Sequence, residues 1–263
     1  MSLDGFTETE VLLFFASLSR VIGLFLLLPI FGDQNVPGLV RIFLAFTINI
    51  VVYPVAMSYG TASLIPLLGS DMGIVILVLK EAAVGVVMGF TARIFFDAMT
   101  FAFSHMGTQM GFSMASAYDH HSEANTPVIS QLIMILAMLL FLATDGHHFF
   151  VRALVDSYGA VPVGGFVLKK SVALHILETS AQVFWIGVKL SAPMALVIFL
   201  INCAFGIVAK AVPQINVLVV SFTVNILAGF LVITLTLPVF GTSMAEVIQL
   251  MVERVESVMK VLA

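Results

Sequence analysis

Long runs of apolar residues recur along this chain, separated by short polar or helix-breaking stretches. The runs are continuous and do not alternate apolar with polar residues, as the strands of a membrane β-barrel would. Several reach the roughly 18 to 20 residues that a helix needs to cross a bilayer. We locate them at about residues 11 to 31, 39 to 57, 72 to 96, 98 to 117, 128 to 143, 180 to 203 and 214 to 240. The pattern predicts an all-α, polytopic membrane protein with about six to seven hydrophobic segments.

Helix-interrupting residues mark the boundaries between these segments. Gly32 and Pro37 follow the first segment, Asp145-Gly146 follows the fifth, and Pro213 precedes the seventh. The fourth segment carries enough polar residues to be a re-entrant or pore-facing stretch instead of a span. Because no long linker divides the chain, we expect a single membrane domain over residues 1–263.

The last twenty residues have the pattern of a short amphipathic helix at about 242 to 263. Its apolar residues recur at helical spacing: Val247, Met251, Val255, Val258 and Leu262. Such a helix can lie on the membrane surface or dock onto a partner subunit, and the sequence favours neither.

Composition agrees with lipid as the solvent of this chain. Hydrophobic residues make up 60% and charged residues 10%, against roughly 25% charged in soluble domains. The 11 Lys and Arg are dispersed along the chain, with only Lys169 and Lys170 adjacent, and form no basic stripe, so nucleic acid is excluded as a partner. Cys203 is the only cysteine. Without a nucleophile elbow, phosphate loop, zincin motif or catalytic carboxylate pair, we expect neither an enzyme nor a cofactor.

Lys80 and Glu81 lie near the centre of the third segment, where each charge costs roughly 2.5 to 3.5 kcal/mol to insert. Adjacent helix residues do not face each other, and the neighbours one turn away are apolar. Their partners must therefore come from other helices, another chain or water. An interhelical ion pair with Arg20 or Lys189, a water-filled path or subunit interface, and a proton relay all remain open.

Two glycine pairs permit close helix approach. Gly85 and Gly89 are four residues apart, as are Gly107 and Gly111, and small residues one turn apart let a second helix pack closely. The second pair begins a stretch rich in Met, Gly and Ser at residues 107 to 116; we call this stretch together with the polar loop that follows it the Gly-Met segment (residues 107 to 126). Its flexible, soft side chains suit a surface that must seal and then repack.

The histidines do not predict a metal site. His147-His148 follows Asp145, and His120-His121 forms a second pair. Consecutive histidines on a helix point roughly 100° apart, and the usual zinc spacing of three intervening residues is absent. We expect Asp145-Gly146 to end one helix and begin another.

Four groups of residues occur in an order and spacing that is specific when taken together. They are Lys80-Glu81 with Gly85 and Gly89-Phe90; Gly107-x-Gln109-Met110-Gly111-x-Ser113; Asp145-Gly146-His147 with Ser157 and Pro162; and Ala192-Pro193, Asn202, Gly206 and Pro213-Gln214-Ile215-Asn216. This pattern resembles the FliR family, the flagellar members of a group shared with virulence-type secretion systems.

The resemblance implies a non-enzymatic subunit of the flagellar type III export gate, which exports unfolded proteins during flagellum assembly. It implies helical hairpins in a helical gate assembly at the basal body, in the bacterial inner membrane and in contact with its lipid. The implied partners are FliP-type and FliQ-type subunits and FlhB. The main rival is a secondary transporter that binds a small solute through midplane charges, and it predicts an internal repeat that we do not find.

The resemblance also implies roles for individual residues. The pore plug would include Gly107, Gln109, Met110, Gly111, Phe112, Ser113 and Met114. Helix packing or a subunit interface would involve Lys80, Glu81, Gly85, Gly89, Pro213, Gln214 and Asn216.

Overall fold

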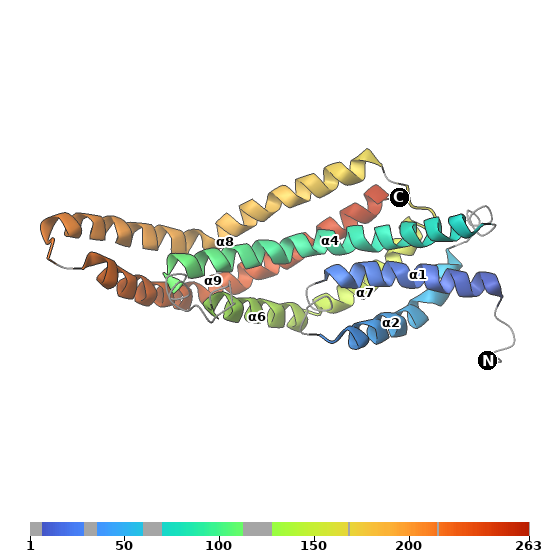
Figure 1. The fold of residues 1–263 in the computed structure, drawn as a ribbon, viewed down its shortest axis with the longest axis horizontal. Coiled ribbons are helices and arrows are strands. Elements are labelled where there is room, and N and C mark those ends of the chain that lie inside the picture. Colours follow the sequence, from blue (N-terminus) through green and yellow to red (C-terminus); the bar gives the residue numbers. More distant parts are fainter. Residues whose placement is uncertain are drawn as a thin grey trace. The chain divides into compact units, whose positions relative to one another are not determined.

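The computed structural model describes residues 7–28, 36–59, 70–112, 128–167, 169–214 and 216–262, and within these ranges the regular structure is helical (Figure 1). The helices are α1 (Glu8–Leu27), α2 (Gly38–Ser58), α4 (Asp71–Gln109), α6 (Val128–Ala143), α7 (Gly146–Ala160), α8 (Lys170–Ala211) and α9 (Val217–Leu262). Within the described ranges, α1, α2, α4, α8 and α9 are long and apolar enough to cross a membrane, and the broken pair α6 and α7 makes a sixth candidate. The predicted all-α, polytopic membrane fold is confirmed.

Three helices are longer than the predicted segments: α4, α8 and α9. The predicted boundary near residue 97 is wrong, because α4 runs through it for 39 residues. Asp97 lowers the local hydropathy, but no Pro or Gly stands beside it to end a helix. α8 begins at Lys170 rather than near residue 180 and contains Pro193. At 1.5 Å per residue, such helices span roughly 60 Å, about twice the hydrocarbon thickness of a bilayer.

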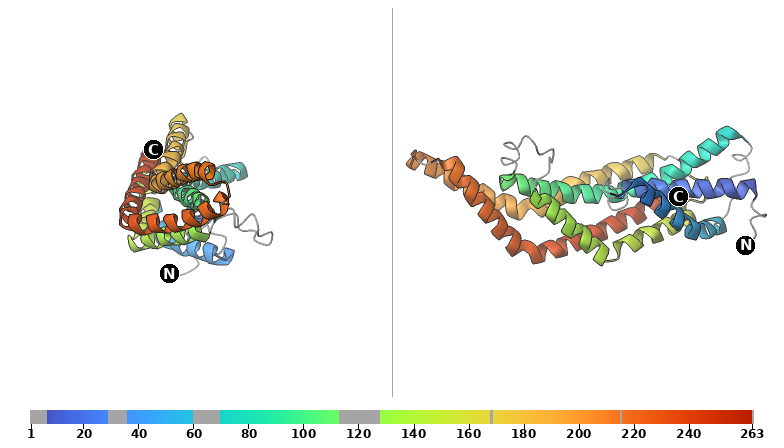
Figure 2. Two further views of the ribbon diagram at one scale, coloured as in Figure 1. Left: turned by 90° about the vertical axis from the view of Figure 1, so that its left-hand side faces the viewer. Right: turned by 60° about the horizontal axis from the view of Figure 1, so that its bottom comes forward.

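The C-terminal residues 242–262 are helical but are not a separate helix, because they continue α9. Their apolar stripe is buried within the chain: Val247, Met251, Val255, Val258 and Leu262. Neither of the two sequence-based alternatives, the membrane surface or a partner subunit, is needed to cover this stripe. Pro238 lies inside α9, and the ribbon of α9 bends along its length in the right-hand view of Figure 2.

The residue contacts divide the chain into two compact units. Unit 1 comprises Met1–Phe95, Asp145–Ser180 and Gln249–Ala263. In unit 1, α2 packs on α1 and α7 (Figure 1). Buried Ser17 joins these helices, since its hydroxyl donates to Asn49 Oδ1 over 2.9 Å and its carbonyl accepts from the Tyr158 hydroxyl over 3.3 Å.

Unit 2 comprises Phe96–Thr144 and Ala181–Ile248. The end of α4 packs on α6 and α9: the Ser130 hydroxyl donates to the Phe103 carbonyl over 2.8 Å, and the rings of Phe103 and Phe240 lie 5.5 Å apart. An apolar cavity of about 300 Å³ lies among these helices and α8, with Met106 and Phe230 in its lining.

Candidate functional site

Glu81 on α4 and Arg20 on α1 form an ion pair in the core of unit 1. Arg20 Nε donates to Glu81 Oε2 over 2.7 Å, and both side chains are fully buried. Of the alternatives that the sequence left open, the interhelical pair with Arg20 is therefore present. The charge on each side chain is neutralised across the α1–α4 contact.

The other polar atoms of this pair bond to α7 and to the turn that follows it. Arg20 donates to the Ser157 hydroxyl over 3.1 Å and to the Val161 carbonyl over 3.0 Å. The Gly164 N–H donates to Glu81 Oε1 over 2.8 Å. A buried ion pair requires such additional hydrogen bonds to offset the loss of hydration. We call these five residues the Arg20–Glu81 network; it links α1, α4 and α7.

Lys80 and Tyr158 contact the same network. Lys80 Nζ donates to the Gly164 carbonyl over 3.2 Å, and the Arg20 guanidinium lies over the Tyr158 ring, 4.1 Å from its centre. Gly164 has a φ of 79°, which glycine adopts without steric cost. This backbone conformation lets one residue bond to Glu81 through its N–H and to Lys80 through its carbonyl.

Gly85 and Gly89 lie where α4 packs against α1. A Cβ atom at Gly85 would overlap the carbonyl oxygen of Arg20, and one at Gly89 would lie 2.7 Å from that of Leu24. Gly23 on α1 faces α4 in the same way, with the Ala82 carbonyl oxygen 2.6 Å from its would-be Cβ. The clashing atoms are backbone atoms, which cannot rotate away. The glycines hold α1 and α4 close enough for Arg20 to reach Glu81.

We expect Gly85→Leu and Gly89→Leu to separate α1 from α4 and to reduce the recovery of folded chain and assembled complex severely. Overpacking of this kind typically costs about 1 to 3 kcal/mol even where side chains can adjust. Gly241→Leu is the matched control, because no described residue lies within 4 Å of its would-be Cβ, its chain neighbours and the backbone of its own helix aside. Monodispersity after heating in detergent measures the effect. A Gly85→Leu chain as heat-resistant as Gly241→Leu would contradict the prediction.

The Gly-Met segment begins inside α4 and continues past its end. Gly107 and Gln109 are still helical, and α4 ends at Gln109. Gly111 has a φ of 93°, and its N–H donates to the Thr108 carbonyl over 3.0 Å. A left-handed glycine directly after a helix is a common way to end it. Ser113 and Met114, also predicted in the plug, lie outside the described residues.

The described part of the Gly-Met segment lies against α9. Met110 is fully buried, and its side chain occupies the space beside Gly229 where a Cβ would stand. The ring of Phe222 lies 2.8 Å from the would-be Cβ of Gly111, and the rings of Phe112 and Phe230 meet edge to face at 6.4 Å. These contacts between the segment and α9 are apolar and use flexible or aromatic side chains.

Pro213, Gln214 and Asn216 lie in the connection between α8 and α9 and are exposed. Asn216 caps α9: its side-chain oxygen accepts from the Val219 N–H over 3.4 Å. Within unit 2, the helices α8 and α9 are also joined by a hydrogen bond of 3.1 Å between Asn225 and Asn202. The structure thus assigns Asn216 a local capping contact and places the other two on the surface of the isolated chain.

Several residues of these sites were not predicted from the sequence. Val161 and Gly164 act through backbone groups, which leave no residue-type signal. Phe222, Gly229 and Phe230 lie in an apolar run that is typical of any membrane span. Within that run, only Gly229 indicates by its residue type that another segment packs closely against the helix.

Comparison with known proteins shows similarity over almost the full chain. A sequence profile of the bacterial export proteins, family 1, matches residues 11–251. The flagellar biosynthetic protein FliR of Bacillus subtilis is 30% identical over 243 residues, covering 91% of this chain and 92% of that protein. FliR of Escherichia coli is 29% identical over 229 residues, covering 87% and 85%. FliR of Aquifex aeolicus is 24% identical over 252 residues, covering 93% of each chain.

Proposed function

This chain belongs to the bacterial export proteins, family 1, and we propose that it serves as the FliR-type subunit of a flagellar type III protein-export gate. The observation that carries the proposal is the family match over residues 11–251. The long apolar helices agree with a membrane location. We place the chain in the bacterial inner membrane at the flagellar basal body, with residues 1–263 acting as one membrane domain.

We propose FliP-type and FliQ-type subunits and FlhB as its partners. The end of α8 and the start of α9 support this, because their large apolar side chains are exposed on the isolated chain: Phe199, Leu200, Ile207, Leu218, Val219 and Leu227. Polar Asn202, Gln214 and Asn216 are interspersed among them. A face that combines apolar area with hydrogen-bonding groups suits neighbouring helices better than lipid alone. Pro213, Gln214 and Asn216 would belong to this subunit interface.

We propose that the Gly-Met segment plugs the export path in the closed gate. Met110, Gly111 and Phe112 lie just beyond the end of α4 and rest on α9 through apolar contacts. Phe230, which meets Phe112, also lines the apolar cavity of about 300 Å³. Protein interiors are normally close-packed, so a cavity here leaves room for the segment to repack when an unfolded flagellar protein passes.

The proposed role is conduction of exported proteins, not catalysis or solute transport. A secondary transporter needs charges that are free to bind a coupling ion or a solute. Arg20 and Glu81 instead bond to each other and to groups on α7 and the following turn. The family match concerns export proteins and gives no support to the transporter.

Deleting the gene for this chain in its host should abolish motility and the appearance of flagellar proteins outside the cell, and the wild-type gene should restore both. Affinity purification of the tagged chain should recover the FliP-type and FliQ-type subunits. Motile cells with normal flagella would refute the proposal. A deletion strain that keeps its flagella but fails to take up a solute would favour the transporter instead.

A further inference from the structure

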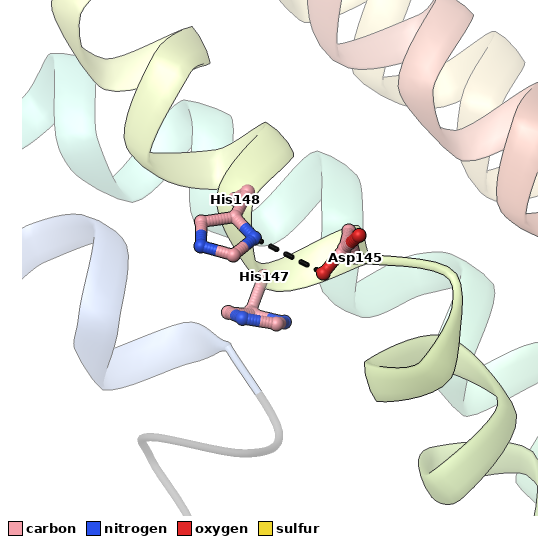
Figure 3. A group of neighbouring side chains, drawn as sticks. All are labelled: Asp145, His147 and His148. Carbon is pink, nitrogen blue, oxygen red and sulfur yellow. Dashed lines mark hydrogen bonds and ion pairs between the residues drawn. The ribbon is translucent and has the colours of Figure 1, made fainter.

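Asp145, His147 and His148 gather at the first turn of α7, within unit 1 (Figure 3). Each residue offers one possible metal ligand, a ring nitrogen or a carboxylate oxygen, and these three atoms lie within 4.8 Å of one another. His148 Nδ1 is 3.2 Å from Asp145 Oδ1, and the centres of the two imidazole rings are 4.1 Å apart. The rings of His147 and His148 therefore lie close together, although the two residues are adjacent in the helix.

The backbone directs the Asp145 carboxylate toward these rings. Asp145 stands at the N-cap position of α7, where an aspartate ordinarily accepts a hydrogen bond from a backbone N–H of the first turn. Here its φ is 56°, and in the described part of the chain its side chain makes no such capping bond. The Asp145 carbonyl accepts from the His148 N–H over 3.0 Å instead. The carboxylate is therefore not engaged in capping α7, and it contacts His148 Nδ1 instead.

Independently of this geometry, His147 indicates that a ligand is missing at the cluster. Its Nδ1 atom is buried and has no hydrogen-bond partner among the residues that the structure describes. Buried polar atoms are almost always satisfied, and an imidazole nitrogen is satisfied either by a hydrogen bond or by a metal ion. A cation beside this ring would supply the partner.

We propose that Asp145, His147 and His148 bind a divalent transition-metal ion, for which Zn²⁺ is the best match. Two imidazoles and one carboxylate are a donor set that zinc accepts in four-coordinate sites, with water in the fourth position. Tetrahedral zinc places its ligand atoms roughly 3.4 Å apart, so the three side chains must close by somewhat more than 1 Å. The Asp145 and His148 side chains are 76% and 71% exposed, which leaves them free to rotate. The ion would stiffen the first turn of α7.

The test is zinc binding by the full chain, purified in detergent without a polyhistidine tag, alone or with the subunits that co-purify with it. Competition with a chromophoric chelator measures the zinc affinity, and Co²⁺ substitution reports tetrahedral coordination through its visible absorption. We expect one ion per chain and a tetrahedral Co²⁺ spectrum. His147→Ala, His148→Ala and Asp145→Asn should each weaken binding about tenfold or more, since even loss of a group that supports a ligand costs 10- to 100-fold.

His105→Ala is the matched control, because His105 is an exposed histidine paired with Gln109 in unit 2, and it should bind zinc as the wild type does. Asp145→Asn guards against misfolding, because asparagine also tolerates a positive φ and keeps a carbonyl oxygen. Elution as a monodisperse species shows that each variant is folded. Absence of zinc binding by the wild type, or equal affinity in the wild type and in Asp145→Asn and His148→Ala, would overturn the proposal.

Discussion

An Arg20→Met chain is expected to lose most of its folded population, with an unfolding free energy about 3 to 5 kcal/mol below that of the wild type. Methionine fills much of the volume of arginine but leaves Glu81 as a fully buried, unpaired carboxylate. It also removes the hydrogen bonds from Arg20 to Ser157 and to the Val161 carbonyl. Folded proteins are stable by only about 5 to 15 kcal/mol. A loss of this size in the unfolding free energy should therefore remove most of the assembled protein from the membrane.

The exposed ion pair between Lys189 and Glu246 provides the matched control. Its Nζ–Oε2 distance is 2.8 Å, but the two side chains are 54% and 65% exposed, so Lys189→Met should cost no more than about 1 kcal/mol. Denaturant titration in detergent micelles measures both variants. An Arg20→Met chain that unfolds at the same denaturant concentration as Lys189→Met would show that the buried pair does not hold unit 1 together.

A double-mutant cycle separates the charge from the packing. Glu81→Leu alone leaves the Arg20 guanidinium buried without its anion, so it should destabilise the chain as strongly as Arg20→Met. The double variant removes both charges, and replacing a buried pair by apolar residues is much less costly than removing one partner. We expect partial recovery, because the Gly164 N–H and Val161 carbonyl still lose their partners. Strictly additive losses would exclude an electrostatic coupling between the two residues.

The sequence predicted that Lys80 and Glu81 need partners outside their own helix, but it did not identify all of them. The apolar neighbours one turn away forced the first conclusion. The partners include the N–H of Gly164 and the carbonyl of the same residue, and any residue carries such groups. Arg20 was one of two cations considered, and only the packing of α1 on α4 through Gly23, Gly85 and Gly89 selects it.

Helix boundaries, too, were predicted from the sequence only in part. Apolar runs located α1, α2, α6 and the apolar parts of α4, α8 and α9, but none of the predicted segments covers α7; Asp145-Gly146 and Pro213 marked real interruptions. Asp97 did not, because a single charged residue without a neighbouring Pro or Gly does not end a helix, and Asp97 is exposed on α4. The stripe from Met251 to Leu262 read as amphipathic from sequence, but its burial inside unit 1 depends on helices that are distant in sequence. Periodicity shows that a face is covered and does not identify its neighbour.

Removal of residues 110 to 117 is expected to leave the gate assembled and to let ions and small solutes leak across the membrane. The deletion begins after Gln109, where α4 ends, so it should spare the helix. It removes the fully buried side chain of Met110 and the Phe112 ring that meets Phe230. Apolar side chains close a narrow pore by excluding water. Conductance or dye entry, measured in cells with confirmed assembled complex, reports the leak.

Two further variants test whether the apolar side chains themselves form the seal. Replacing residues 110 to 117 by eight Gly and Ser residues keeps the chain length, so a leak in this variant assigns the seal to side chains and not to length. Gly229→Leu places a side chain where Met110 now lies, and it should produce a smaller leak by displacing that methionine from α9. If the segment were instead an ordinary packed part of unit 2, the deletion would abolish assembly. An assembled deletion complex that admits neither ions nor dye would refute the plug, because the pore would then be closed by other residues.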